Sequence, residues 1–258
     1  MFISTQELVK IYKDDSVLIL DARSYKDYSK AHIPGAVSLD LFSFHWADTS
    51  EKGLISFGEH MRKILSYAGV DENKKIIFYD NTSGMLAARG VWMCLYFSHP
   101  DVQMLDGGMS KWTEENLTTE TESTIYKPSN LTTPIDPSII IGFEELNENI
   151  GNVTIIDARS SDEYNGTTPR AARGGHIPTA KNIDWTNNLD DSGKLKSDEQ
   201  LESLYSMDKE TEIVTYCQGA YRAANSYLSL KKIGFKNVKV YLGSWGEWGN
   251  DLNLPIEK

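Results

Sequence analysis

The sequence has few of the residues that would point to a metalloprotein, a disulfide-rich protein or a membrane protein. Among 258 residues there are two cysteines, Cys94 and Cys217, and neither they nor the five histidines show metal-ligand or disulfide-framework spacing. No apolar run is long enough to cross a bilayer, and the N-terminus lacks a basic region followed by an apolar core. We therefore expect a cytoplasmic protein without a metal and without a membrane partner.

Positive charge is also scarce. The sequence has 26 Lys and Arg against 37 Asp and Glu, which gives a net charge of −11. That charge opposes binding to nucleic acid, because no lysine-rich stretch offsets the repulsion between polyanions. A hydrophobic content of 40% is typical of a globular protein, and the length fits two domains of about 125 residues each.

What the sequence does contain is an internal repeat. The segment 17–24 recurs at 153–160, an offset of 136 (157 − 21), and the segment 105–112 recurs at 241–248 with the same offset. The His-Ile-Pro motif at His32 recurs at His176, and Asp80 matches Cys217. The order of the matched blocks indicates a duplicated domain. We expect the histidines, and the Asp-x-Arg motifs of both copies, to brace the fold, since they occur in both copies.

Each copy alternates short apolar runs with helical patterns, which predicts a mostly parallel sheet covered on both faces. Predicted strands are 17–20, 76–79, 102–105, 153–156, 213–216 and 238–242. Predicted helices or helical turns include a short helix after the Ser4-x-x-Glu7 capping box and the ranges 24–30, 59–67, 83–96 and 222–233. Residues 117–137 lack either periodicity and predict a linker.

Cys217 has the setting of a reactive thiol. It follows the predicted strand 213–216 and precedes the predicted helix 222–233, where backbone N–H groups and the helix dipole stabilise an anion. Gly219, Ala220 and Arg222 are typical of an anion-binding loop, and they favour a reactive cysteine over a buried structural one. Cys94, in contrast, lies in an apolar helical segment and is predicted to be an inert core thiol.

With the Asp-x-Arg, His-Ile-Pro and cysteine-loop motifs in one order, the chain resembles the two-domain rhodaneses, which are thiosulfate and mercaptopyruvate sulfurtransferases. The resemblance implies an α/β fold of two tandem rhodanese-like domains, each a mainly parallel five-stranded sheet with helices on both faces. It implies a catalytically inactive domain at 1–120 with Asp80 in place of the nucleophile. A linker at 121–137 and a catalytic domain at 138–258 follow.

The resemblance also implies sulfur transfer without a cofactor. The Cys217 thiolate would take sulfur from a small anionic donor and pass it from a persulfide to a thiophilic acceptor such as cyanide. This chemistry needs a thiol whose pKa lies below the usual value of about 8.5. The expected substrate-binding loop comprises Gln218, Gly219, Ala220, Tyr221 and Arg222.

An insertion in the second copy supplies further arginines. Tyr164 precedes His176 by 12 (176 − 164), whereas Tyr28 precedes His32 by 4 (32 − 28), and the inserted segment includes Arg170 and Arg173. By resemblance, an arginine near the His-Ile-Pro motif contacts the donor's anionic group, and Arg173 matches that position better than Arg170. The alternative for both arginines is a solvated surface pair or a salt bridge to Asp157 or Glu163.

Several functional alternatives stay open at this point. Arg222 favours thiosulfate over 3-mercaptopyruvate as donor, although the loop departs from the usual patterns of both enzyme types. Phosphatases related to this fold use a seven-residue Cys-x5-Arg loop, whereas Cys217 to Arg222 spans six residues, which favours sulfur chemistry. The third class is a noncatalytic sulfur-carrier module. Neither the acceptor nor the oligomeric state can be read from the sequence, and for the latter a monomer is a reasonable expectation.

Overall fold

The computed structural model describes residues 1–258 and divides them into two compact units. The first unit comprises Met1–Phe44, Gly58–Asp136 and Leu189–Leu195, and the second comprises His45–Phe57, Pro137–Asn188 and Lys196–Lys258. Each unit therefore includes one short segment from the other half of the sequence. Neither of these segments carries a pattern that would assign it to a unit.

Each unit contains one five-stranded sheet in which every pair of neighbouring strands is parallel. The strand order is β1-β5-β4-β2-β3 in the first unit and β6-β10-β9-β7-β8 in the second, so the two orders are equivalent. The strands of the first sheet are β1 (Phe2–Ile3), β2 (Val17–Asp21), β3 (Val37–Ser38), β4 (Lys75–Tyr79) and β5 (Val102–Leu105). Those of the second are β6 (Ile140–Ile141), β7 (Thr154–Asp157), β8 (Lys181–Asn182), β9 (Ile213–Tyr216) and β10 (Val238–Tyr241). The predicted fold class is confirmed.

Helices connect the strands, as parallel strand pairs require. In the first unit they are α1 (Thr5–Ile11), α2 (Tyr25–Tyr28), α4 (Met85–Tyr96) and α5 (Gly108–Glu114); α3 (Glu51–Tyr67) begins within the segment assigned to the second unit. In the second unit they are α6 (Phe143–Glu148), α7 (Ser161–Tyr164), α8 (Asp198–Tyr205), α9 (Tyr221–Lys232) and α10 (Ser244–Trp248). Three short 3-10 helices, η1 (Leu41–Ser43), η2 (Pro137–Ile139) and η3 (Trp185–Asn188), complete the elements.

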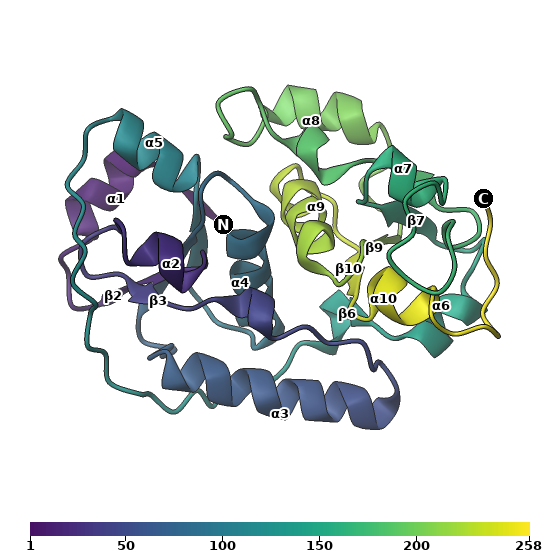
Figure 1. Cartoon of the computed structure of the whole chain (residues 1–258), viewed down its shortest axis with the longest axis horizontal. Helices are drawn as coiled ribbons and strands as arrows, with labels where there is room; N and C mark the ends of the chain where they lie inside the picture. The colour runs from purple at the N-terminus through teal and green to yellow at the C-terminus, as the bar shows by residue number, and fades with distance from the viewer. The chain divides into compact units, whose positions relative to one another are not determined.

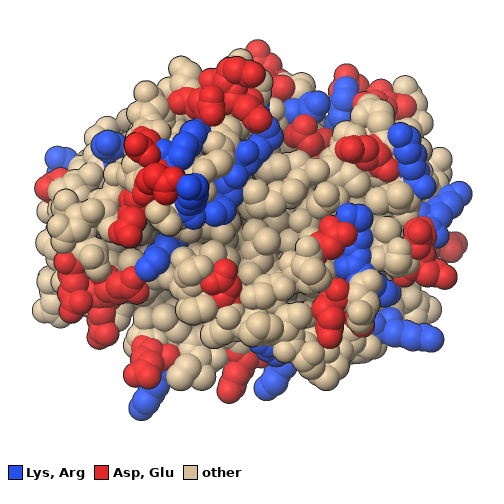
Figure 2. Space-filling model, turned by 180° about the vertical axis from the view of Figure 1, so that it is seen from behind, with Lys and Arg blue, Asp and Glu red and all other residues tan.

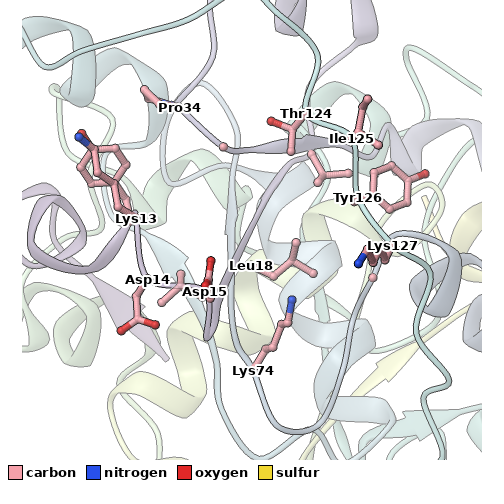
Figure 3. Close-up of a pocket in the computed structure, with 15 residues that line it drawn as sticks. Lys13, Asp14, Asp15, Leu18, Pro34, Lys74, Thr124, Ile125, Tyr126 and Lys127 are labelled. Atoms are coloured by element: carbon pink, nitrogen blue, oxygen red, sulfur yellow. The ribbon is translucent and has the colours of Figure 1, made fainter.

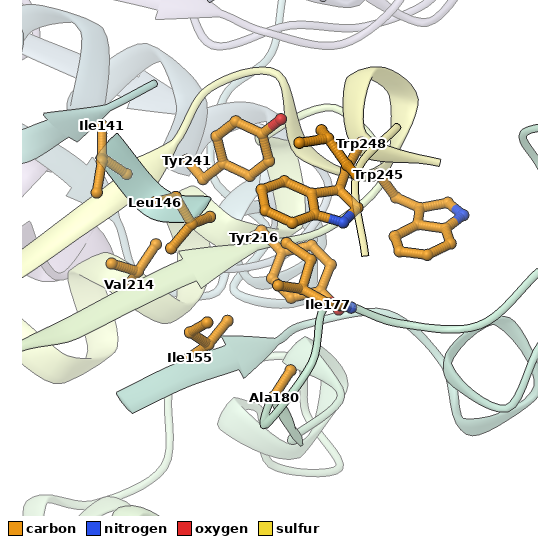
Figure 4. Close-up of a cluster of buried hydrophobic side chains, with 11 residues drawn as sticks. Ile141, Leu146, Ile155, Ile177, Ala180, Val214, Tyr216, Tyr241, Trp245 and Trp248 are labelled. Atoms are coloured by element: carbon orange, nitrogen blue, oxygen red, sulfur yellow. The ribbon is translucent and has the colours of Figure 1, made fainter. Parts of the chain in front are cut away.

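The second sheet is buried on both faces, because the side chains of its strands alternate between two layers of helices. On one face, Val214 and Tyr216 of β9 join a buried cluster with Leu146 of α6 and Trp245 of α10 (Figure 4). On the other face, the Thr215 hydroxyl donates to a backbone oxygen of α9, which lies beside β9 and β10 (Figure 1). Strand β9 is therefore held firmly, and it ends directly before Cys217.

The predicted linker contains no helix or strand up to Asp136, and several of its residues are hydrogen-bonded to the first unit. Glu120 and His32 exchange two backbone hydrogen bonds of 2.9 Å, and the Arg62 guanidinium donates to the carbonyls of Leu131 and Thr133. The linker sequence is thus part of the first unit rather than a free tether.

The surface drawn in Figure 2 carries Lys and Arg among Asp and Glu, without an extended area of positive charge alone. None of the helices combines the length and hydropathy that a membrane crossing requires.

Candidate active site

Cys217 lies at the carboxyl end of a central strand, in the loop that leads into α9. The residue is only 1% exposed, and the loop turns into the helix at Ala220, whose φ of 65° is in the left-handed region. A parallel sheet places the ends of its strands, and the N-termini of the helices that follow them, at one edge. The structure therefore puts the thiol where the sequence predicts it, beside a helix N-terminus.

Ser244 holds this loop in shape. Its Oγ accepts the N–H groups of Cys217 (3.2 Å) and Ala220 (3.0 Å) and donates to the carbonyl of Tyr241. The loop carbonyls of Cys217 and Gln218 accept N–H groups of Trp245 and Gly246 at 2.9 Å. The Ala220 amide, which the sequence prediction directed at the donor or the sulfur, is thus used by Ser244 instead.

Arg222 links the thiol to a buried carboxylate. Its Nη1 and Nη2 donate to the two oxygens of Glu163 at 2.5 and 2.9 Å, and the guanidinium also interacts with Cys217. Burial alone would lower the pKa of Arg222, but the hydrogen bonds to Glu163 and the neighbouring Cys217 raise it above the ordinary value. The arginine is therefore fixed as a cation next to the sulfur.

The two arginines of the insertion lie in different surroundings. Arg170 has a side chain that is 55% exposed, and its Nη1 is 3.6 Å from Glu163. Its backbone carbonyl accepts a hydrogen bond from the Gln218 side chain, which ties the insertion to the cysteine loop. The guanidinium can still bind an anion, because its ion pair to Glu163 is long and solvated.

Arg173, in contrast, fastens the C-terminal segment. Its guanidinium donates to the carbonyls of Trp248, Gly249, Asp251 and Leu254. A role in binding the donor stays a prediction, and it would require these hydrogen bonds to be exchanged for bonds to the substrate.

A histidine from the first half of the sequence packs against the cysteine loop. His45 begins the segment 45–57 that belongs to the second unit, and its ring lies parallel to that of Tyr221, with centroids 6.2 Å apart. A Cβ added to Gly219 would lie 1.7 Å from His45 Cε1. Gly219 is therefore needed for close approach between the loop and the histidine ring.

The first copy shows how the equivalent loop binds a carboxyl group. The Asp80 carboxylate accepts N–H groups from Thr82 and Gly84 on one oxygen, and from Leu86 and Ala87 on the other, at 3.0–3.1 Å. The last two are amides of the first turn of α4, the helix that corresponds to α9 in the repeat. Burial raises the pKa of Asp80, against the effect of these four hydrogen bonds. A carboxyl group at the end of the strand thus receives helix amides, at the place that Cys217 has in the second copy.

The motifs shared by both copies have the bracing contacts expected of them. Arg159 pairs with Asp157 at 2.6 Å and donates to the carbonyl of Gly175, and both side chains are buried. His176 stacks on Tyr164 with centroids 3.7 Å apart, and the same stack recurs between His32 and Tyr28.

A separate hollow of about 550 Å³ lies in the first unit (Figure 3). Lys74 and Lys127 extend toward Leu18, and Thr124 and Tyr126 also line the hollow. None of the predicted site residues lines it. No group of three His, Cys, Asp or Glu side chains in the structure is placed to hold a metal ion.

Comparison with known proteins decides the family. Residues 4–115 and 143–251 each match the family described as the rhodanese-like domain. The chain belongs to the rhodanese family. Its two matches correspond to the two sheets, so the protein consists of tandem rhodanese domains.

Rhodanese relatives with different names are similar over nearly the whole chain. The sulfur carrier protein TtuD of Thermus thermophilus is 33% identical, over 100% of this chain and 96% of that protein. The thiosulfate sulfurtransferase of Pseudomonas aeruginosa is 30% identical, over 93% of this chain and 91% of that protein.

Among solved structures, SseA from Escherichia coli, whose description concerns 3-mercaptopyruvate sulfotransferases, is similar with a TM-score of 0.80 and 26% identity. The match covers 95% of this chain and 98% of SseA. An ergothioneine biosynthesis enzyme from Chlorobium limicola has a TM-score of 0.86 at 20% identity, over 98% of this chain and 67% of that chain, and shows the fold alone.

Sequence reasoning named Glu163 only as an alternative partner of Arg170 and Arg173, and it missed Ser244 and His45. A signal for Glu163 was present, because Ser160 and Glu163 form a capping box that marks the start of a helix. Ser244 aligns with Gly108 (244 − 136), and both have positive φ, of 54° and 56°. No comparable signal marks His45, which reaches the loop through tertiary structure.

Proposed function

We propose that the protein moves sulfane sulfur from thiosulfate, or a similar anionic donor, to a thiophilic acceptor through a persulfide on Cys217. One observation carries the proposal: the rhodanese loop of the second domain presents a cysteine beside a fixed arginine, whereas that of the first presents Asp80. A carboxylate cannot form a persulfide. Transfer therefore requires Cys217.

The proposed reaction has two displacements. The Cys217 thiolate attacks the outer sulfur of thiosulfate, the donor's S–S bond breaks, and its electron pair leaves with sulfite. A nucleophile such as cyanide then attacks the terminal sulfur of the persulfide, which forms thiocyanate and returns the thiolate. Arg222 stabilises the thiolate in the first step and its return in the second, since a cation next to a sulfur anion favours the charged form.

The donor's charged group needs a cation that is not already fully bonded. Arg170 fits this need better than Arg173 in the present geometry, because its guanidinium is more than half exposed and its ion pair to Glu163 is long. We therefore assign donor binding to Arg170 first, with Arg173 as the alternative. The exposed position at the mouth of the loop suits a small anion that arrives from solvent.

Two further functions have specific support. The 26% identity to SseA of Escherichia coli favours 3-mercaptopyruvate as a second candidate donor. In that case a C–S bond breaks, and the pyruvate fragment leaves as an enolate that takes up a proton. The 33% identity to a sulfur carrier protein favours a protein thiol as the acceptor of the same persulfide.

The first test measures sulfur transfer directly. Steady-state rates with thiosulfate and with 3-mercaptopyruvate, each with cyanide as acceptor, identify the donor. Cys217→Ser should abolish transfer with both donors, and the wild-type peptide that contains Cys217 should gain the mass of one sulfur atom after donor treatment.

The matched control is the other cysteine. Cys94 is buried in α4, and burial raises the pKa of its thiol well above the ordinary value, so Cys94→Ser should leave transfer nearly unchanged. Sulfur found on Cys94 rather than Cys217 would contradict the proposal. If the protein hydrolysed aryl phosphates faster than it converted either sulfur donor, the proposal of a sulfurtransferase would give way to that of a phosphatase.

A further inference from the structure

We infer that Glu163 is a positioning residue for the proposed sulfur transfer: it holds the Arg222 guanidinium against Cys217 and so increases the thiolate fraction near neutral pH. The inference rests on the proposed function, because it assigns a partner to the arginine of that site. It adds a residue from α7, 59 positions away from Arg222, to the machinery of the cysteine loop.

The geometry of the pair restrains the guanidinium strongly. Two roughly parallel hydrogen bonds of 2.5 and 2.9 Å fix both the position and the plane of the group, which one bond would not. The side chain of Glu163 is 8% exposed and that of Arg222 is 13% exposed, so solvent weakens the pair little. The pKa of Glu163 lies at about 2, because the hydrogen bonds and charge of Arg222 outweigh the effect of burial.

The repeat separates this role from simple helix capping. Asp27 of α2 occupies the position of Glu163 (163 − 136), and the backbone N–H of each residue donates to the hydroxyl of its own N-cap, Ser24 or Ser160. The Asp27 carboxylate, however, is hydrogen-bonded to Ser24 and Lys30, close by in the sequence, and its side chain is 42% exposed. The position equivalent to Arg222 in that copy is Leu86 (222 − 136).

Capping therefore does not require the reach of Glu163. The glutamate is one methylene longer than Asp27, and its carboxylate binds an arginine of α9 in addition to its own N-cap residue, Ser160. The long-range bond occurs in the copy that has a cysteine and is missing in the copy that has Asp80.

The direction in which a change at Glu163 shifts the thiolate fraction of Cys217 distinguishes a positioning role from a purely electrostatic one. The charged and titratable groups around the cysteine loop include Arg222 and Tyr221 of α9, Glu163 of α7, Arg170 of the insertion and His45 of the segment 45–57. Removing the negative charge of Glu163 would by itself favour the thiolate. Releasing Arg222 would disfavour it, because the cation would no longer be held at the sulfur.

The deciding variant is Glu163→Asp, which keeps the charge and the cap but loses the reach. Asp27 shows that a helix capped by serine forms with aspartate at this position, where the carboxylate accepts the cap hydroxyl, so we expect the variant to fold. The rate of Cys217 alkylation by iodoacetamide should have its midpoint shifted to higher pH, by about one unit if most of the contact with Arg222 is lost. Sulfur transfer should fall at pH 7 and recover toward the wild-type rate at pH 9, with little change in the donor's KM.

Three comparisons complete the test. Glu163→Gln should shift the midpoint in the same direction; a shift to lower pH would show that Glu163 mainly repels the thiolate and would overturn the inference. In an Arg222→Ala background, Glu163→Asp should have no further effect on the midpoint. Asp27→Asn, the matched control in the first copy, should change stability without moving the midpoint.

Failure of the inference is distinct from failure of the proposed function. Alkylation reports on the thiol whether or not sulfur is transferred. An unmoved midpoint in Glu163→Asp, in an enzyme that still transfers sulfur, leaves the function standing and limits Glu163 to helix capping. A wild-type protein that transfers no sulfur from either donor overturns the function itself.

Discussion

At the scale of single residues, the pair of Glu163 and Arg222 should make the free energy of unfolding depend on pH in the acidic range. The pKa of Glu163 is about 2 in the folded protein against an ordinary value of 4.5, so the folded state favours the ionised form. Its stabilising contribution is complete above pH 4.5 and is lost as the pH falls toward 2. The contribution is on the order of 2 kcal/mol after allowance for solvent screening.

Chemical denaturation of the wild type and of Glu163→Gln at a series of pH values measures this contribution. The difference between their free energies of unfolding should be largest above pH 4.5 and should shrink as the pH falls to 2. A difference that stays constant across this range would mean that the ionised carboxylate contributes no net stability.

At the scale of elements, the loops that follow β4 and β9 differ in length and in the groups that hold them. The loop from Asp80 to Met85 is one residue longer than that from Cys217 to Tyr221, because the starts of α4 and α9 differ by 136 (221 − 85) whereas Asp80 and Cys217 differ by 137 (217 − 80). The longer loop is filled by its own carboxylate. The shorter loop leaves a thiol at the strand end and is held by Ser244.

The shorter loop should tolerate no side chain at Gly219. Gly219→Ala places a methyl group against the His45 ring, so either the ring or the loop must move. Sulfur transfer should fall, and removing the ring in the double variant Gly219→Ala/His45→Ala should restore a large part of it. No recovery in the double variant, with His45→Ala itself active, would show that the histidine is not the obstacle.

Much of this architecture could be predicted from sequence, because continuous apolar runs mark central strands and the repeat supports each assignment twice. The strands 102–105 and 213–216 have the predicted bounds, and α9 begins one residue before the prediction. The edge strands were not predicted, since two residues carry no periodicity. Helix α3 begins at Glu51 rather than at the predicted residue 59, with Gly53 weakening the helical pattern of its first turns.

The candidate site was less accessible to sequence reasoning, because its contacts are tertiary. Cys217 and Arg222 could be found from the loop and its helix, whose residues are contiguous. The bonds of Glu163 to Arg222, of Ser244 to the Ala220 amide and of Arg173 to the C-terminal carbonyls join positions 24 to 81 residues apart. No local pattern indicates which side chain fills such a position.

At the scale of the whole molecule, the second unit depends on a segment that lies outside the second half of the sequence. Thr49, in the segment 45–57, donates its N–H and its hydroxyl to the Glu247 carboxylate at 2.7 and 2.5 Å, and its Oγ1 accepts the N–H of Phe143. Tyr241 donates its hydroxyl to the same carboxylate at 2.7 Å. Burial raises the pKa of Glu247, against the effect of these hydrogen bonds.

A fragment of residues 138–258 should therefore fold less stably than the full chain and transfer sulfur more slowly. Without residues 45–57, Glu247 loses two of its donors, the Phe143 amide loses its acceptor, and the loop loses its packing against His45. Thermal unfolding of the fragment should begin at a lower temperature, and a synthetic peptide of residues 45–57 should raise it. The full-length variant Thr49→Val, which removes only the hydroxyl, should show an intermediate loss. If the fragment matches the full chain in both unfolding temperature and transfer rate, the segment is dispensable and the second half of the sequence is a self-sufficient domain.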